Sequence, residues 1–389
     1  MKIIYYCQHV LGIGHFFRSL EICKAFSGQE VILVTGGSRV PAQLPSHVRE
    51  MHLPELMMDQ EFSILYSPEK DKSVAQVMQE RQQLFFHLFE TEAPDLFIVE
   101  LYPFGRKAFR FEIDPILEGI RCGDLPPCRV ICSLRDILVE KKNPEVYEAR
   151  VIDILNRYFN ALLIHADPRA IKLDETFSRV KDITVPIVYT GFVTPKPAMD
   201  AGVMLRQRLG IAREEILIVA SAGGGNVGNI LLDAVVETFE VMDTDKPAYL
   251  HVFTGPFLGE DAFERLRRIP NRRIQIFRFT PDFLSYLSAA DLSVSMAGYN
   301  TCMNIAAAQV PALVWPFPQN REQGLRAVRL AELGILQVLT DEELHPRRLS
   351  AIMQQGISLR SRSIVDIDLS GAESAVRWLL ENPALPERL

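Results

Sequence analysis

The chain has 389 residues, of which 48% are hydrophobic and 23% are charged, and its formal net charge is −7. This length exceeds that of one ordinary α/β domain, so we expect two domains, and the composition is typical of a globular protein rather than of a fibrous or disordered one. The negative net charge disfavours a nucleic-acid partner, because no surplus of basic residues is present to displace counterions from a phosphate backbone.

The sequence lacks the features of a secretion signal and of a membrane span. The apolar run after Met1 is short and is interrupted by Gln8 and His9, and no segment approaches the roughly 20 apolar residues that a spanning helix needs. The six cysteines are scattered without a C-x-x-C pair, so we interpret them as reduced core residues. We therefore expect a cytoplasmic protein.

The first half of the chain alternates short apolar runs with longer helical stretches. Strands are expected at residues 2–8, 30–35, 96–99, 129–133 and 161–165, and helices at 16–26, 74–90 and 143–159. Strands that alternate with helices predict a parallel sheet, in which ligands bind at the carboxyl ends of the strands. A turn at 12–15 that contains two glycines joins the first strand to the first helix.

The second half repeats this pattern after a connector at 188–197 that is rich in proline and turn residues. Its strands are expected at 216–220, 248–253, 273–277, 292–295 and 312–315, with a helix at 229–239. We predict an α/β fold of two doubly wound, Rossmann-like domains that face each other across a cleft. The predicted boundaries are 1–190 for the N-terminal domain, 191–199 for a linker, 200–370 for the C-terminal domain and 371–389 for a helix that packs back toward the N-terminal domain.

The most informative segment is a turn from a strand into a helix near residue 298. A strand ends at Ser295, Gly298 allows a tight turn, and an alanine-rich helix follows. Because the first N–H groups of a helix have no partner inside it, they form a seat for an anion. We expect four residues to bind phosphate there: Gly298, Tyr299, Asn300 and Thr301. The alternative is that Gly298 only admits the chain into the helix and that Asn300 and Thr301 are N-caps.

A proline-rich loop follows one strand later and carries side chains that suit hydroxyl groups. These side chains are Gln319, Asn320, Glu322 and Gln323. A phosphate seat beside groups that bind hydroxyls favours a nucleotide-sugar as the ligand. Glu322 and Gln323 have an alternative interpretation as solvated first-turn residues of a helix at 324–333, a position that suits acidic and amide groups.

Both halves open with a glycine-rich turn, which raises the alternative of a dinucleotide-dependent dehydrogenase. The turn at 223–228 matches G-x-G-x-x-G, but this pattern alone has low specificity. The turn at 12–17 lacks the third glycine, and the following strands end in Thr35 and Thr254 instead of the acidic residue that would hold a ribose. We therefore favour a nucleotide-sugar as a co-substrate and expect no cofactor.

These segments give the chain a resemblance to the GT-B glycosyltransferases of the family 28 type. It resembles in particular the predicted transferases related to the bacterial N-acetylglucosaminyltransferase that completes the lipid-linked peptidoglycan precursor. The resemblance covers both halves, through the turns at 12–15 and 223–228 and the segments 297–301 and 316–323. It extends to three segments that are similar to those of a poorly characterised branch of these proteins: 100–106, 133–136 and 165–168.

The resemblance implies a hexosyltransferase that moves a sugar from a nucleoside-diphosphate sugar, with UDP as the expected nucleotide, to an acceptor hydroxyl with inversion. The C-terminal domain would bind the donor and the N-terminal domain the acceptor. Further donor contacts are expected from Gly223, Gly224, Gly225, Asn226, Arg278 and Phe279. The family's glutamate that holds the ribose corresponds to Asn304, whose amide can bond a diol but is no charged double acceptor. The base of the nucleotide therefore stays open.

The reaction needs a base for the acceptor hydroxyl and a stabilising group for the leaving diphosphate. The helix N-terminus after Gly298 can replace a metal ion in stabilising the diphosphate. The D-x-D sequences, at 243–245 and 366–368, are expected in connectors away from the ligand-binding strand ends, so we expect no catalytic metal.

His15 is our candidate for the base, because an imidazole titrates near neutrality. The alternative is that His15 only caps the first helix or packs beside Phe16 and Phe17. Three residues are held in reserve for this role: Glu100, Asp136 and His9. Glu100 ends an expected strand, so it could instead orient His15, whereas Asp136 could simply pair with its neighbour Arg135.

Five residues are expected to line the acceptor side or the cleft: Gly12, Gly14, Tyr102, Arg106 and Arg135. Arg106, Lys107 and Arg110, interleaved with phenylalanines, could bind an anionic acceptor or simply cover a helix. Apolar stretches at 62–66 and 84–89 leave a peripheral membrane contact open, although the helical spacing of the second favours a core face. Two alternatives to a transferase also stay open: a non-hydrolysing nucleotide-sugar epimerase and a catalytically silent nucleotide-sugar-binding protein.

Overall fold

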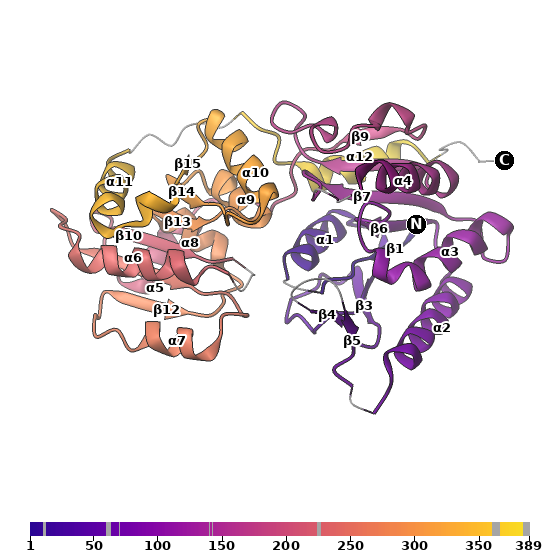
Figure 1. The fold of residues 1–389 in the computed structure, drawn as a ribbon, viewed down its shortest axis with the longest axis horizontal. Coiled ribbons are helices and arrows are strands. Elements are labelled where there is room, and N and C mark those ends of the chain that lie inside the picture. Colours follow the sequence, from indigo (N-terminus) through magenta and orange to yellow (C-terminus); the bar gives the residue numbers. More distant parts are fainter. Residues whose placement is uncertain are drawn as a thin grey trace. The chain divides into compact units, whose positions relative to one another are not determined.

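A computed structural model of the chain describes residues 1–10, 13–59, 64–69, 71–139, 141, 143–223, 227–359 and 366–383. The chain folds into two compact units (Figure 1). The first comprises Met1–Val193 together with Asp368–Leu389, and the second comprises Thr194–Ile367. The border between Val193 and Thr194 falls inside the expected linker at 191–199, and the C-terminal helix belongs to the first unit.

The first unit is built on a parallel sheet whose described strands have the order β3-β2-β1-β6-β7-β8-β9. These strands are β1 (Lys2–Tyr6), β2 (Glu30–Thr35), β3 (Val48–His52), β6 (Leu96–Glu100), β7 (Arg129–Arg135), β8 (Ala161–His165) and β9 (Ile187–Tyr189). A separate antiparallel pair consists of β4 (Met57–Met58) and β5 (Leu65–Tyr66). Most residues of the sheet are buried on both faces, which explains why its strands are continuous apolar runs in the sequence.

Helices cover both faces of this sheet (Figure 1). They are α1 (Gly14–Ala25), α2 (Val74–Glu92), α3 (Arg110–Cys122), α4 (Pro144–Tyr158) and α12 (Gly371–Glu381), with 3₁₀ turns at Lys107–Phe109, Leu173–Glu175 and Val180–Asp182. Successive strand residues point to opposite faces. Tyr5 therefore belongs to the core that α1 and α12 complete, whereas the ring of Tyr6 packs against Phe85 of α2, with the ring centres 5.3 Å apart.

The second unit has the same plan, with the described strands in the order β12-β11-β10-β13-β14-β15. The strands are β10 (Ile216–Ser221), β11 (Ala248–Phe253), β12 (Ile274–Phe277), β13 (Leu292–Met296), β14 (Ala312–Trp315) and β15 (Gln337–Val338). The helices are α5 (Ala201–Leu209), α6 (Asn229–Val241), α7 (Glu260–Arg267), α8 (Phe283–Ala289), α9 (Tyr299–Ala308), α10 (Arg321–Glu332) and α11 (Pro346–Ser358), with a 3₁₀ turn at Asp341–Leu344. Each unit is thus a doubly wound α/β fold, as the sequence predicted.

Each sheet has one point where the strand order reverses direction. This switch point lies between β1 and β6 in the first unit and between β10 and β13 in the second. In open parallel sheets, ligands bind beyond the carboxyl ends of the two strands at this point. The segments that follow these four strands are therefore where a functional site is expected in each unit.

Several expectations about individual segments were wrong. Cys122 is exposed at the end of α3 and Cys128 is half-buried, so only four of the cysteines are core residues. The expected connector begins later, because Val188 and Tyr189 pair with β8 as part of β9.

The two apolar stretches at 84–89 and 62–66 differ in burial. In α2, Phe85, Leu88 and Phe89 are buried as expected, but Leu84 is exposed. Of the stretch at 62–66, residues 62 and 63 lie outside the described residues, and Ile64 and Tyr66 are exposed. No described helix is long and apolar enough to span a membrane.

A buried arginine joins the helical layer of the first unit to the sheet and its loops. Arg81 of α2 donates two hydrogen bonds to the carboxylate of Glu112 in α3, at 2.8 and 2.6 Å, and both side chains are fully buried. Arg81 also donates to the carbonyl oxygens of Gly36 and Pro54 and to the side-chain oxygen of Gln8. The pair is therefore fully hydrogen-bonded, which offsets the cost of removing two charges from water.

We expect Glu112→Gln to lower the free energy of unfolding by about 3–5 kcal/mol, because the change leaves the buried Arg81 charge uncompensated. Urea denaturation followed by circular dichroism measures this. The control is Asp153→Asn in α4, which breaks an exposed pair with Arg157 and should cost less than about 1 kcal/mol. Equal losses in the two variants would contradict the structural role of the buried pair.

Candidate functional site

His15 lies in the first turn of α1, directly after the segment that follows β1. The N-cap residue of α1 is Ile13 and no side chain makes a capping hydrogen bond, so His15 does not cap the helix. Its side chain is about one-fifth exposed and points to Glu100 rather than only packing beside the phenylalanines. Gly14 is the first residue of the helix, while Gly12 lies outside the described residues.

Glu100 is the last residue of β6, so it stands at the switch point opposite the start of α1. The carboxylate is fully buried. Its Oε1 accepts hydrogen bonds from His15 Nδ1 at 2.7 Å and from Arg18 Nη2 at 2.5 Å, and its Oε2 accepts from Arg106 Nη2 at 2.9 Å. Burial alone would raise the pKa of Glu100, but His15, Arg106 and Arg18 hold it well below its usual value. Glu100 is therefore a carboxylate.

The contact with Glu100 decides which nitrogen of His15 carries the proton. A carboxylate only accepts hydrogen bonds, so the shorter contact, with Glu100, makes Nδ1 the protonated nitrogen, and Nε2 carries the lone pair. Arg18 Nη2, at 3.1 Å from Nδ1, is then a close neighbour and not a hydrogen-bond donor to it. Among the residues that the structure describes, Nε2 has no hydrogen-bond partner. Burial lowers the pKa of His15 to about 3, which keeps the imidazole neutral at pH 7. An oriented neutral imidazole with an open Nε2 can accept a proton from a hydroxyl group.

A tight turn brings Arg106 back onto Glu100. Leu101 and Arg106 both adopt left-handed backbone conformations, with φ of 67° and 58°. The turn is closed by a hydrogen bond from Gly105 N to Leu101 O at 2.8 Å. Such conformations cost a non-glycine residue about 1–2 kcal/mol, and they occur where the surrounding contacts fix them. This backbone geometry places the guanidinium of Arg106 within ion-pair distance of the Glu100 carboxylate.

Sequence reasoning missed Arg18, although a signal for it was available. Arg18 follows His15 by three residues in an expected helix, and this spacing places two side chains on one face. Asp136 and Tyr102, two other candidates, make contacts of their own. Asp136 is fully buried and accepts a hydrogen bond from the Ile137 N–H at 2.8 Å. Tyr102 donates its hydroxyl to Asp114 of α3. Arg135 ends β7, the strand next to β6.

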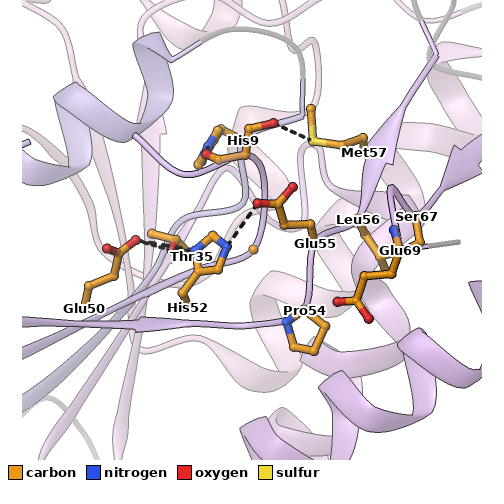
Figure 2. Close-up of polar contacts among 12 residues, drawn as sticks. His9, Thr35, Glu50, His52, Pro54, Glu55, Leu56, Met57, Ser67 and Glu69 are labelled. Atoms are coloured by element: carbon orange, nitrogen blue, oxygen red, sulfur yellow. Dashed lines mark hydrogen bonds and ion pairs between the residues drawn. The ribbon is translucent and has the colours of Figure 1, made fainter. Parts of the chain in front are cut away.

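His9, the other reserve candidate, belongs to a different polar cluster at the carboxyl ends of β2 and β3 (Figure 2). Its Nε2 donates to the carbonyl oxygen of Ser38 at 2.7 Å. Nearby, His52 lies 2.9 Å from the hydroxyl of Thr35, which in turn donates to Glu50 at 2.5 Å. Sequence reasoning missed this cluster because it did not predict β3. A carboxylate thus orients His15, whereas a backbone carbonyl oxygen holds His9.

In the second unit, the segment after β13 enters α9 through Gly298, the N-cap residue. Its φ of −68° is ordinary, so the backbone there does not require glycine. Tyr299, Asn300 and Thr301 form the first turn, and the N-cap residue has no side chain to cap the helix. Asn300 and Thr301 are therefore not N-caps. An uncapped helix N-terminus at a switch point is suited to bind an anion.

The turn after β10 lies against the start of α9. Gly223 has a φ of +72°, and a Cβ on it would lie 3.6 Å from Thr301 Oγ1. Its N–H donates to Ser221 Oγ at 3.0 Å, and Ser221 pairs in register with Ser295 of β13. The two predicted phosphate-binding turns are thus neighbours. Three of the predicted donor residues, Gly224, Gly225 and Asn226, lie outside the described residues.

The side chains expected to bind hydroxyls are mostly engaged in holding the start of α10. Asn320 is its N-cap and accepts from the Gln323 N–H, while Gln323 Oε1 accepts from the Phe317 N–H at 3.1 Å. Glu322 is buried and pairs with Arg326 at 2.8 Å, so its interpretation as a solvated residue was wrong. The helix also begins at residue 321, earlier than expected, because Asn320 caps it. Gln319 is exposed.

Asn304 and Arg278 are also engaged. The amide oxygen of Asn304 accepts a hydrogen bond from Thr194 Oγ1 at 2.9 Å. Arg278 donates to Leu258 O at 3.0 Å and pairs with Glu260, so its side chain holds the start of α7. Phe279 is about 40% exposed. The side chains of Asn304 and Arg278 are therefore both held by other residues of the protein.

Among the described residues, no group of three or more histidine, cysteine, aspartate or glutamate side chains is arranged to hold a metal ion. Asp243 and Asp245 lie between α6 and β11, at the amino end of that strand. Asp368 accepts hydrogen bonds from the backbone N–H and the hydroxyl of Ser370. The sequence at 243–245 therefore lies away from the carboxyl ends of the strands, as expected. The expectation for 366–368 was wrong, because the Asp368 N–H donates to Asp167, two residues beyond the carboxyl end of β8.

Solved structures of other proteins share this fold. The chain is similar to MurG of Acinetobacter baumannii over 98% of this chain and 99% of that one, with a TM-score of 0.55 and 14% identity. It is similar to the glycotransferase of kitacinnamycin over 98% of each chain, with a TM-score of 0.59 and 16% identity. The chain therefore has the GT-B fold that these structures share.

Residues 221–364, from the end of β10 past α11, match the glycosyltransferase family 28 C-terminal domain. The chain is 23% identical over 209 residues to an uncharacterized glycosyltransferase of Methanopyrus kandleri, which covers 52% of this chain and 56% of that one. It is 31% identical over 150 residues to a UDP-N-acetylglucosamine–N-acetylmuramyl-(pentapeptide) pyrophosphoryl-undecaprenol N-acetylglucosamine transferase of Carboxydothermus hydrogenoformans, over 38% of this chain and 40% of that one. The chain therefore matches only about half the length of these relatives or less. Its C-terminal part matches a family 28 domain, and the chain resembles glycosyltransferases of this type.

Three buried histidines predict how stability depends on pH. Burial lowers the pKa of His15 and His165 to about 3 and that of His251 to about 4. Below pH 6.5 the unfolded chain takes up protons that the folded chain does not, so the free energy of unfolding falls as the pH drops toward 4. Each histidine contributes a slope of up to about 1.4 kcal/mol per pH unit.

Urea denaturation of the wild type and of His251→Phe at pH 7, 6 and 5 tests this expectation. His251 packs among aromatic rings, so phenylalanine is a compatible replacement. The variant should lose less stability than the wild type between pH 6 and pH 5, because one titrating group is gone. Identical losses over that interval would show that His251 is not held neutral by burial.

Proposed function

We propose that this chain transfers a sugar from a nucleoside-diphosphate sugar to an acceptor hydroxyl, without a metal ion and with inversion at the anomeric carbon. The observation that carries the proposal is the hydrogen bond that His15 Nδ1 donates to the Glu100 carboxylate. This bond leaves the lone pair of His15 Nε2 available to accept a proton. The family 28 domain and the glycosyltransferases among the similar proteins support the class of reaction. The printed name of one relative begins with UDP-N-acetylglucosamine, which supports UDP as the nucleotide.

In the proposed reaction, His15 Nε2 takes the proton of the acceptor hydroxyl. The acceptor oxygen then forms a bond to the anomeric carbon while the bond from that carbon to the diphosphate oxygen breaks. Glu100 stabilises the imidazolium that forms, because its carboxylate already accepts a hydrogen bond from Nδ1. A single displacement of this kind inverts the configuration at the anomeric carbon.

The leaving diphosphate gains negative charge as the bond breaks. The N–H groups in the first turn of α9 and the dipole of this helix would stabilise that charge in place of a metal ion. Arg326 supports this turn from within the protein, because it donates to the carbonyl oxygen of Ala297 at 3.2 Å and is fully buried. The turn is therefore held in place before a ligand binds.

We expect His15→Ala to lower turnover of the donor sugar at least about a hundredfold and to leave UDP affinity nearly unchanged, because a general base acts in the transition state and not on the nucleotide. Mass spectrometry of a panel of nucleotide-sugars measures turnover, and calorimetry measures UDP binding. The control is His87→Ala, which changes an exposed histidine of α2. Turnover equal to that of the wild type would remove His15 from the reaction.

The same assay separates the proposal from its alternatives. A transferase releases UDP and joins the sugar to water or to an acceptor. A donor that is isomerised without an acceptor would indicate the epimerase, and tight binding without any turnover would indicate a silent binding protein.

We expect Gly298→Val to weaken UDP binding at least about tenfold without changing the melting temperature. A Cβ at this position would lie 4.0 Å from Thr301 Oγ1, which is ordinary contact distance, so the described part of the fold has room for it. A branched side chain there would, however, keep a diphosphate from reaching the backbone N–H groups. The control is Gly259→Val, at the N-cap of α7, where a Cβ would also meet open space. Unchanged UDP affinity in Gly298→Val would remove this turn from the donor site.

A further inference from the structure

Three arginines in the described part of the first unit are deeply buried and pair with a glutamate: Arg18, Arg81 and Arg106. Arg81 and Arg106 differ in how many hydrogen bonds they make. Arg81 donates five hydrogen bonds from Nε, Nη1 and Nη2. Arg106, whose side chain is 7% exposed, donates a single one to the described residues, from Nη2 to Glu100. Its buried Nε has no partner among the described residues. Arg81 is satisfied by the protein alone, and Arg106 is not.

An unsatisfied buried guanidinium costs free energy, because its N–H groups lose their bonds to water without replacement. Arg106 is not the sole cation at Glu100, since Arg18 contacts the same carboxylate at 2.5 Å. Arg106 is nevertheless held in place by a strained turn, with left-handed conformations at Leu101 and at Arg106 itself. The turn therefore holds in place the guanidinium of Arg106, which has N–H groups that no described residue accepts.

Arg106 also lies next to the proposed base. The Glu100 carboxylate bridges the two side chains, because its Oε1 accepts a hydrogen bond from His15 and its Oε2 accepts one from Arg106. A guanidinium presents its donors in a planar fork, which matches the two oxygens of a phosphate or a carboxylate. A ligand that reaches His15 with a hydroxyl group could therefore reach Arg106 with an anionic group.

We propose that Arg106 binds an anionic group, a phosphate or a carboxylate, of the acceptor whose hydroxyl His15 deprotonates. This inference rests on the proposed function and adds the class of the acceptor: a molecule with a hydroxyl close to a negative charge. Arg110 serves as the contrast, because it is exposed and pairs with Asp114 through an ordinary helix contact at 3.1 Å.

The test is a calorimetric titration of the full chain with inorganic phosphate and, separately, with acetate. Saturating UDP is present, so that the proposed diphosphate seat in the second unit is already filled. We expect the wild type to bind at least one of the two anions. Arg106→Gln should weaken that binding at least tenfold, Arg106→Lys should give an intermediate affinity because it keeps the charge and loses the fork, and Arg110→Gln should bind as the wild type does.

The preferred anion identifies the source: phosphate indicates a phosphorylated acceptor, and acetate indicates a carboxylated one. Absence of binding to the wild type, or equal affinity in Arg106→Gln, would overturn the inference. UDP binding is measured first in each variant and should not change. A wild type that fails to bind UDP would contradict the proposed function instead, so the two failures are distinguishable. Arg106→Lys keeps the test decisive if Arg106→Gln does not fold.

Discussion

The burial of the Glu100 carboxylate is the constraint on which the organisation of the first unit's site depends. A carboxylate without water must be compensated by charged or hydrogen-bonding partners. The structure supplies these partners from two places, α1 with His15 and Arg18 and the turn that carries Arg106. One buried charge thus fixes the entry to α1, the course of residues 101–106 and the tautomer of the imidazole.

The second unit also buries a charged side chain and compensates it with a side chain of opposite charge, but there the charge is positive. There the buried charge is the guanidinium of Arg326, which Glu322 compensates from the preceding turn of α10. Arg326 also donates to the carbonyl oxygen of Ala297, just before the N-cap of α9. The side chains of the loop at 316–323 and of the start of α10 therefore mainly hold the backbone in place, including the turn before α9, and do not mainly face a ligand. In this unit the groups best placed to meet an anion are backbone N–H groups of α9.

The sequence predicted the parts of this structure that depend on local pattern. Apolar runs located most long strands, and glycine before a helix located the turns at both switch points. It could not show which distant charges meet. Glu100 and Arg18 are 82 residues apart, and their contact depends on the pairing of β1 with β6, which no local pattern encodes. The burial of Glu322 was missed for a related reason, because its spacing from Arg326 fits an exposed helix pair as well as a buried one.

The low pKa of His15 links the base to the proposed anion. Burial is the main cause, and the positive charge of Arg106 adds to it, while Glu100 opposes both. An anion bound to Arg106 would offset that positive charge, and the pKa of His15 would rise toward the value at which an imidazole is an effective base. Without an acceptor, the same imidazole stays neutral and weakly basic, which disfavours activation of water. In the proposed reaction, the strength of the base would thus depend on whether the acceptor is bound.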